Sequence, residues 1–226
     1  SNWQIQGYGR PQYTNIRYPD AIITKGCKKP YINPSKNPCG LYMRKFEIKN
    51  FDDNISINFA ANSASELYIN GEFVGYSESS FDYQEYDITK YLKIGENEIK
   101  ILVYQFCTGS YLEDQDMWRI SGIFRDVNLV FIPKTYVRDI YARSEFGDDL
   151  TKPKLLVDCV VRNKNTSFTN ATVVLELLDG SKSIVKESQT IEELIDCDKK
   201  TLKFEKQLSE IKLWSSEYPN LYLLRL

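Results

Sequence analysis

The chain has 226 residues, of which 42% are hydrophobic and 13% aromatic, and its formal net charge is −2. This length fits one large or two ordinary domains with real hydrophobic cores. The near-neutral charge, without a basic stripe, argues against a nucleic-acid partner. No apolar run approaches the roughly 20 residues of a membrane span, and the start Ser-Asn-Trp-Gln lacks the basic and apolar regions of a signal peptide.

Histidine is absent, and the five cysteines form no metal-binding or disulfide pattern. Their number is odd, their spacings are long, and no Cys-x-x-Cys occurs. This usage favours reduced thiols in a reducing compartment, so we expect a cytoplasmic protein. The lack of histidine excludes Ser-His-Asp and Cys-His nucleophile systems and histidine metal sites.

Hydrophobic residues alternate with polar ones in several segments, which is the period of strands rather than of helices. The clearest series cover residues 55–59, 155–161 and 173–177. In the middle of residues 98–106 the side chains that would point to either face of a strand are apolar. This pattern is typical of a central strand covered on both faces. The sequence therefore predicts an all-β protein built as two sandwiches.

A few short segments indicate turns between these strands. Asn70-Gly71 stands between two apolar stretches and predicts a type I′ hairpin. We expect a single turn at residues 90–92 and a short helix or turn at residues 191–195.

The domain boundary is expected near Pro133, where a strand over residues 127–132 ends. Proline cannot donate to a β-ladder, and a new alternating series begins at Tyr136. We therefore assign residues 1–133 to a first domain and residues 134–226 to a second. The second domain has about six strand candidates, and its last apolar series has no closing turn, so we expect an immunoglobulin-like sandwich that lacks its final hairpin.

The most informative stretch places three carboxylates next to a tryptophan. Glu113, Asp114 and Asp116 are followed by Trp118 and Arg119, between two strand-like segments. Carboxylates accept hydrogen bonds from hydroxyls and supply oxygens to hard cations, and tryptophan offers an apolar face. The run therefore predicts a loop that binds a sugar or a cation.

Two carboxylates can also form a glycosidase pair, with one as general acid and the other as nucleophile. Glu113 and Asp116 are the obvious candidates. However, acids on a single loop face solvent, whereas a catalytic pair normally faces across a cleft. We therefore expect no catalytic residue within this chain.

The acidic run and motifs elsewhere resemble the N-terminal jelly-roll domain of bacterial β-galactosidases in glycoside hydrolase family 2. The match is dense from Asn2 to Val127 and sparse over residues 135–212. In the first domain the motifs are Asn2-Trp3-Gln4, Gly7-Tyr8-Gly9, Tyr13-Thr14-Asn15-Ile16-Arg17-Tyr18-Pro19, Asn37-Pro38, Gly40-Leu41-Tyr42, Tyr68-Ile69-Asn70-Gly71, Val74-Gly75-Tyr76-Ser77, Glu85-Tyr86-Asp87-Ile88-Thr89 and Gly95-Glu96-Asn97. Near the end, the immunoglobulin-like domain of the same enzymes is resembled by Leu213-Trp214-Ser215-Ser216-Glu217 and Pro219-Asn220-Leu221-Tyr222.

The resemblance implies the activity of a longer parent enzyme and the part this segment takes in it. The parent would hydrolyse terminal β-galactosides with retention, using two glutamates of a (β/α)₈ barrel that is absent here. The residue matching Asp116 would contact galactosyl hydroxyls and help bind sodium, and the one matching Asn15 would reach the sugar. Magnesium is expected elsewhere in the parent, and neither ion in the isolated segment. The segment would form a wall of the active-site pocket and a docking face for the barrel. The parent could also be a homo-oligomer.

Structural alternatives remain for several of these polar residues. Asn15 could instead form an Asx-turn before the Tyr-Pro pair that follows it. Glu113 and Asp114 are expected to be structural, either accepting backbone N–H groups or pairing with Arg119 or Arg125.

The aromatic residues also have two interpretations. Trp118 could be a stacking platform for a sugar or a buried anchor of its loop. Trp214 is expected to be a core anchor of the second sandwich. We expect the N-terminal aromatic segment to pack across the first sandwich; its members are Trp3, Tyr8, Tyr13 and Tyr18.

Two other functions stay open besides a β-galactosidase segment. An autonomous carbohydrate-binding sandwich would bind sugar without a barrel, because jelly rolls host many unrelated functions. Another family 2 specificity, such as β-glucuronidase or β-mannosidase, is the second; the run over residues 113–118 favours β-galactosidase.

Overall fold

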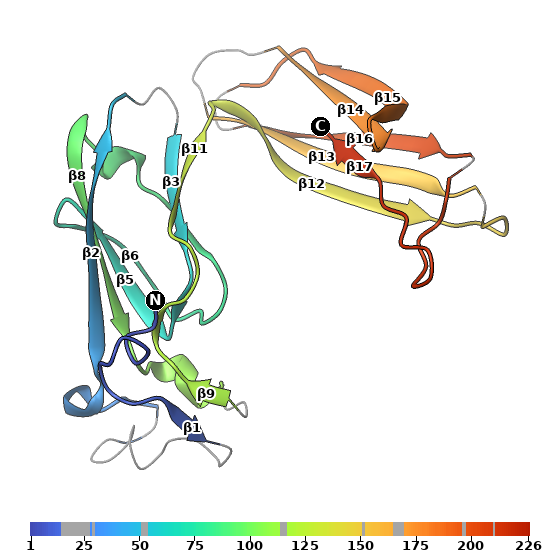
Figure 1. Ribbon diagram of the computed structural model, residues 1–226. Coiled ribbons are helices and arrows are strands. Elements are labelled where there is room, and N and C mark those ends of the chain that lie inside the picture. Colours follow the sequence, from blue (N-terminus) through green and yellow to red (C-terminus); the bar gives the residue numbers. More distant parts are fainter. Residues whose placement is uncertain are drawn as a thin grey trace. The chain divides into compact units, whose positions relative to one another are not determined.

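The computed structural model describes residues 1–14, 28, 30–50, 54–113, 117–150, 152–164, 170–195, 198–209 and 211–226. They form two compact units, Ser1–Ile132 and Pro133–Leu226. Strands make up nearly all of the regular structure (Figure 1), so the all-β prediction is confirmed. Among the described residues, no helix has the length and hydrophobicity needed to cross a membrane.

The first unit contains two larger antiparallel sheets that pack face to face. One has the order β2 (Cys39–Ile48), β8 (Gly95–Tyr104), β5 (Ala64–Ile69) and β6 (Glu72–Ser77). The other has the order β11 (Asn128–Ile132), β3 (Asn54–Phe59) and β7 (Gln84–Asp87). Two short ribbons join β1 (Gln12–Thr14) to β9 (Met117–Arg119) and β4 (Ala61–Asn62) to β10 (Gly122–Ile123). Three short 3₁₀ turns are η1 (Pro34–Lys36), η2 (Thr89–Tyr91) and η3 (Thr108–Tyr111).

The core of the first unit follows the alternation in the sequence. Ile55, Ile57 and Phe59 of β3 are buried, as predicted, and face buried residues of β5 and β8. Strand β8 is central, with β2 on one side and β5 on the other. It is central, as predicted; its inward side chains are buried and its outward ones half-buried, so coverage of the second face is only partial. That face instead carries polar contacts, such as the hydrogen bond from the Tyr104 hydroxyl to Glu66.

The turn signals were mostly correct. Asn70 and Gly71 have φ values of 52° and 88°, so the β5–β6 connection is the predicted left-handed hairpin turn. Turn η2 occupies the segment expected to hold a single turn. Of the short helix or turn expected at residues 191–195, the helix is not formed: Ile191 ends β15, and the Asn163 side-chain amide donates to the carbonyls of Leu194 and Ile195.

The second unit is a sandwich of two three-stranded antiparallel sheets. One has the order β12 (Thr135–Glu145), β13 (Lys154–Asn163) and β16 (Lys199–Gln207). The other has the order β15 (Lys182–Ile191), β14 (Ala171–Asp179) and β17 (Leu223–Arg225). The alternating residues of β13 and β14 are buried in one core, as their period predicts.

Trp214 is not a core anchor, contrary to the prediction, because 63% of it is exposed. The motif around it forms a tight loop in which Trp214 bridges to Pro219 and the Asn220 amide donates to the Leu213 carbonyl. The motif therefore specifies backbone geometry, while the indole ring faces solvent.

Leu67→Ala should destabilise the first unit by ~2–5 kcal/mol, because Leu67 is fully buried in its core and truncation leaves a cavity. Leu41→Ala is the matched control, since Leu41 is 57% exposed on β2 and should change stability by less than ~0.5 kcal/mol. Hydrogen exchange of the β8 amides measures both; equal exchange in the two variants would contradict this account of the core.

Candidate functional site

The predicted sugar-binding residues Asn15 and Asp116, together with Asp114, lie outside the described residues. Their covalent neighbours, Thr14 and Met117, are described. These neighbours are the end pair of the β1–β9 ribbon.

The β1–β9 ribbon brings together two distant parts of the sequence (Figure 1). It is antiparallel, with Gln12 opposite Arg119, Tyr13 opposite Trp118 and Thr14 opposite Met117. In an antiparallel pair, one strand leaves the end at which the other arrives. The chain therefore continues from Thr14 and returns to Met117 at the same end of the ribbon.

An exposed aromatic pair lies in the middle of this ribbon. The Tyr13 and Trp118 rings have centroids 5.6 Å apart and are tilted by 51°. Tyr13 is 50% exposed and Trp118 58% exposed, so the buried-anchor interpretation of Trp118 was wrong. Tilted contacts of this kind stabilise aromatic pairs and fix their ring orientation.

The N-terminal aromatic residues do not all pack across the sandwich as predicted. Trp3 does pack against the core, and a Cβ on Gly40 would lie only 2.5 Å from its ring, so β2 needs glycine there. Tyr8 is 73% exposed, and Tyr13 instead pairs with Trp118. Tyr18 lies outside the described residues.

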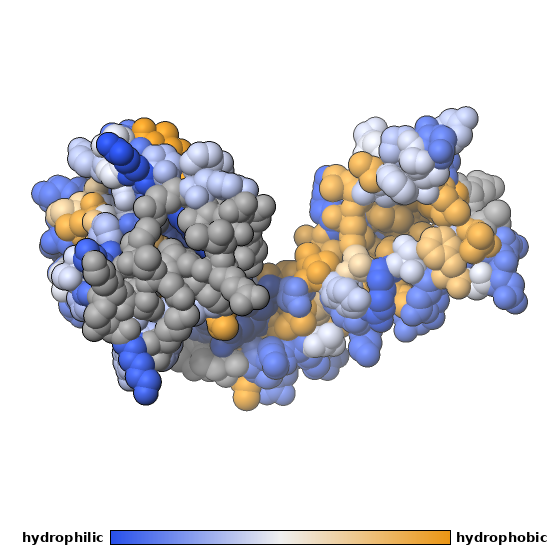
Figure 2. Space-filling view, turned by 90° about the horizontal axis from the view of Figure 1, so that it is seen from below, coloured by the Kyte–Doolittle hydropathy of each residue, from blue (hydrophilic) through white to orange (hydrophobic). Residues whose placement is uncertain are grey.

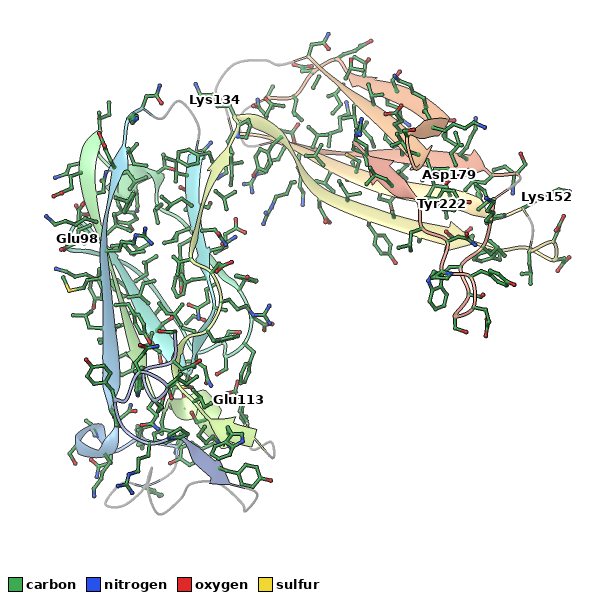
Figure 3. All side chains as sticks on the ribbon, viewed as in Figure 1. Glu98, Glu113, Lys134, Lys152, Asp179 and Tyr222 are labelled. Atoms are coloured by element: carbon green, nitrogen blue, oxygen red, sulfur yellow. The ribbon has the colours of Figure 1, made fainter. Side chains whose placement is uncertain are left out.

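Arg119 connects the two flanks of the acidic run. Its Nη1 atom donates to the Glu113 carbonyl oxygen at 2.7 Å, which connects the two sides of residues 114–116. We expected a contact with the Glu113 carboxylate or with backbone N–H groups; the contact found here uses the backbone carbonyl. Glu113 lies at the end of the first unit that carries β9 (Figure 3).

Buried aromatic side chains and hydrogen bonds hold turn η3, which precedes the acidic run. The Tyr111 ring is buried with Phe106, and its hydroxyl donates to the Tyr31 carbonyl at 3.2 Å. The Asn37 side chain donates to the Phe106 carbonyl and accepts from the Phe106 N–H, both at 2.9 Å. This double contact gives the Asn37-Pro38 motif a structural role that sequence reasoning had not assigned.

A second residue that sequence reasoning missed is Glu78, just after β6. Its carboxylate accepts from the Thr108 hydroxyl at 2.5 Å, the Gly109 N–H at 3.0 Å and the Tyr76 hydroxyl at 2.7 Å. Burial raises the pKa of Glu78, but these donors outweigh burial and hold the pKa below its ordinary value. The carboxylate is therefore charged at neutral pH.

A small buried polar cluster lies next to the turn. The Ser63 hydroxyl is 3.1 Å from the Cys107 sulfur and 3.3 Å from the Ser110 hydroxyl, which in turn accepts from the Cys107 N–H. Cys107, Cys39 and Cys159 are free thiols. Elsewhere, burial raises the pKa of the Cys159 thiol.

A metal site is not found among the described side chains: no group of three or more Cys, Asp or Glu there is placed to hold an ion. Two of the three acids in the predicted sodium-binding run are not among them.

Family models identify the two units. The model for the family 2 glycosyl hydrolase sugar binding domain matches residues 1–133, and a further family 2 glycosyl hydrolase model matches residues 135–226. This chain belongs to glycoside hydrolase family 2. The resemblance seen in its motifs is thus confirmed.

Curated relatives of this family 2 chain carry the name β-galactosidase. One from Priestia megaterium is 39% identical over 228 residues, which is 99% of this chain and 22% of the relative. One from Clostridium acetobutylicum is 39% identical over 98% of this chain and 24% of the relative. The chain therefore spans about a quarter or less of the length of the relatives it matches.

Solved structures show the same fold at low sequence identity. A β-glucuronidase from Bacteroides uniformis matches with a TM-score of 0.76 and 18% identity over 82% of this chain and 24% of that one. A putative β-galactosidase from Bacteroides fragilis matches with a TM-score of 0.73 and 16% identity over 82% of this chain and 29% of that one. These matches support the all-β sandwich architecture.

Arg119→Ala should loosen the closed loop. A hydrogen bond from a charged donor contributes ~1.5–3 kcal/mol, and since Arg119 is half-exposed we expect the lower end. Amides of residues 112–119 should exchange about tenfold faster, while those of β8 stay unchanged. Arg44→Ala, on the exposed face of β2, is the control. If amides 112–119 exchange equally fast in the two variants, the Arg119 contact does not hold the flanks of the acidic run together.

Proposed function

We propose that this chain is the N-terminal part of a β-galactosidase that hydrolyses terminal β-D-galactosides with retention. The observation that carries the proposal is the 39% identity to curated β-galactosidases over nearly the whole chain. Catalysis itself would belong to a barrel elsewhere in the parent, so this chain would position the sugar and not react with it.

Asn15 and Asp116 are the residues we propose to contact the sugar. Support comes from their neighbours, because Thr14 and Met117 are paired at one end of the β1–β9 ribbon. One amide and one carboxylate from this end would supply donors and acceptors to adjacent sugar hydroxyls. Both side chains would then act through binding and orientation, which is how a positioning residue raises the rate.

A sodium ion beside Asp116 is part of the same proposal. The acidic run suits a sodium ion, because it contains three carboxylates, Glu113, Asp114 and Asp116, and hard cations prefer oxygen ligands. When bound, sodium would supply a fixed positive charge next to the sugar hydroxyls. Magnesium is proposed for another part of the parent.

The proposed partner of this chain is the catalytic barrel of the same polypeptide. Large hydrophobic side chains stay exposed on the second unit, where Figure 2 shows an extensive hydrophobic area. Leu213, Leu221 and Leu223 are 39%, 78% and 55% exposed. Exposed apolar groups of this extent are typical of surfaces that contact another protein or domain.

An autonomous sugar-binding module is the second candidate, favoured by the exposed Tyr13–Trp118 pair. Aromatic faces with half their surface exposed are a common platform for sugars. The two candidates differ in whether the chain binds sugar without a barrel. A different family 2 specificity is a further alternative, since glucuronidases and mannosidases share the fold.

The isolated chain should neither hydrolyse a nitrophenyl β-galactoside nor bind galactose or lactose at micromolar concentrations. One loop covers only one side of a monosaccharide, whereas strong sites bury most of their ligand. Calorimetric titration measures the binding. A micromolar dissociation constant that is lost in Trp118→Ala would favour the autonomous module instead.

Asp116→Ala in the full-length parent should lower kcat/KM with little change in thermal stability. Loss of one charge-assisted contact costs ~1.5–3 kcal/mol, which is roughly 10- to 150-fold in kcat/KM. Sodium activation should weaken in parallel. Asp148→Ala removes the same charge from an exposed loop of the second unit and should leave both unchanged. Normal kinetics and sodium response in a folded Asp116→Ala enzyme would rule out the proposed contact.

A further inference from the structure

The register of the larger sheet explains why Glu78 reaches turn η3, 30 residues further along the chain. Ser65 of β5 is opposite Ser77 of β6 on one side and opposite Val103 of β8 on the other. The last residues of β6 and β8 therefore lie at the same edge of the sheet, with the start of β5 between them. Glu78 leaves this edge from β6, and turn η3 leaves it from β8.

The contacts of Glu78 connect a strand to a turn. One carboxylate oxygen accepts both contacts from η3, the Thr108 hydroxyl and the Gly109 N–H. The other oxygen accepts from the Tyr76 hydroxyl, and Tyr76 belongs to β6. Because Tyr76 lies on a paired strand, it holds the carboxylate at a fixed place relative to the sheet. Hydrogen bonds to an ionised acceptor are the strong ones, so the turn is tied firmly to the sheet edge.

Turn η3 leads directly into the acidic loop. The turn ends at Tyr111, and only Leu112 separates it from Glu113. The far end of the loop is held by the Arg119 contact to Glu113 and by pairing of β9 with β1. Glu78 is thus the anchor on the incoming side of the loop, and Arg119 with β1 is the anchor on the outgoing side.

We propose that Glu78 is a positioning residue for β-galactoside binding: it fixes turn η3 at the sheet edge and so sets where the chain enters residues 114–116, the segment that carries Asp116. This inference rests on the proposed function, because the role of Asp116 is part of that function. Glu78 does not touch the sugar and acts through the backbone of the loop. A residue that only stabilised the fold would alter unfolding and leave substrate binding unchanged.

A double-mutant cycle in the full-length parent tests the proposal with nitrophenyl β-galactoside as substrate. Glu78→Ala should lower kcat/KM at least tenfold and raise the sodium concentration for half-maximal activity. The double variant with Asp116→Ala should be no slower than Asp116→Ala alone, within about twofold, because both changes remove the same contact. Glu72→Ala removes an exposed glutamate from the same strand and should leave kcat/KM unchanged.

Glu78→Gln is the second variant, for use if Glu78→Ala does not fold. It keeps the side-chain shape and one oxygen that can accept from Thr108 and Gly109, so it should retain more activity than Glu78→Ala. If Glu78→Ala does not fold, Glu78→Gln takes its place in the cycle, with a smaller loss that is again absent in the Asp116→Ala background.

Two kinetic outcomes would overturn the proposal. The first is unchanged kcat/KM in a folded Glu78→Ala enzyme; the second is a loss that multiplies in full with that of Asp116→Ala. Hydrogen exchange of residues 108–113 distinguishes failure of this proposal from failure of the proposed β-galactosidase function. Unchanged exchange in Glu78→Ala would show that Glu78 does not anchor the turn, whether or not the parent is a β-galactosidase. A wild-type parent without activity on the substrate would instead refute the proposed function.

Discussion

The pairing of β1 with β9 is the constraint on which the candidate site depends. Three backbone pairs join the start of the chain to the segment that follows the acidic run. Neither strand belongs to the two larger sheets, so this ribbon is a separate element at the end of the first unit (Figure 1). Since a register shift of one residue turns every side chain to the opposite face, the observed register is also what brings the Tyr13 and Trp118 rings together.

Polar side chains, in addition to the buried Tyr111 and Phe106, hold the segments around this ribbon. Asn37 pairs with both backbone groups of Phe106, Glu78 accepts from turn η3, and Arg119 donates to the Glu113 carbonyl. Each of these contacts satisfies backbone groups that irregular segments cannot pair among themselves. These contacts hold the described backbone next to residues 114–116.

Much of the fold could be predicted from the sequence, because strand period and turn chemistry are local signals. The alternation at Ile55, Ile57 and Phe59 gave a buried strand face, and Asn70-Gly71 gave the hairpin turn. Glu78 could not be found in this way, since its role follows from a sheet register that joins β6 to β8 through β5. Local pattern carries no information on which strands end at the same sheet edge.

The tryptophans show a second limit of sequence reasoning. Hydrophobicity predicted burial for Trp214, and burial was one of two interpretations for Trp118, yet they are 63% and 58% exposed. The motifs around them specify backbone contacts, namely the Asn220 amide to the Leu213 carbonyl and the pairing of β9 with β1. A ring on a two-stranded ribbon or a tight loop has no second layer of the same unit to cover it, and composition alone cannot reveal that.

The most direct test of the central claim is a crystal structure of the full-length parent with a bound β-galactoside. We predict the ribbon register with Thr14 opposite Met117, and side-chain atoms of both Asn15 and Asp116 about 3 Å from sugar hydroxyls. A sugar bound in the same crystal with neither residue in contact, or a parent in which β1 does not pair with β9, would contradict the account.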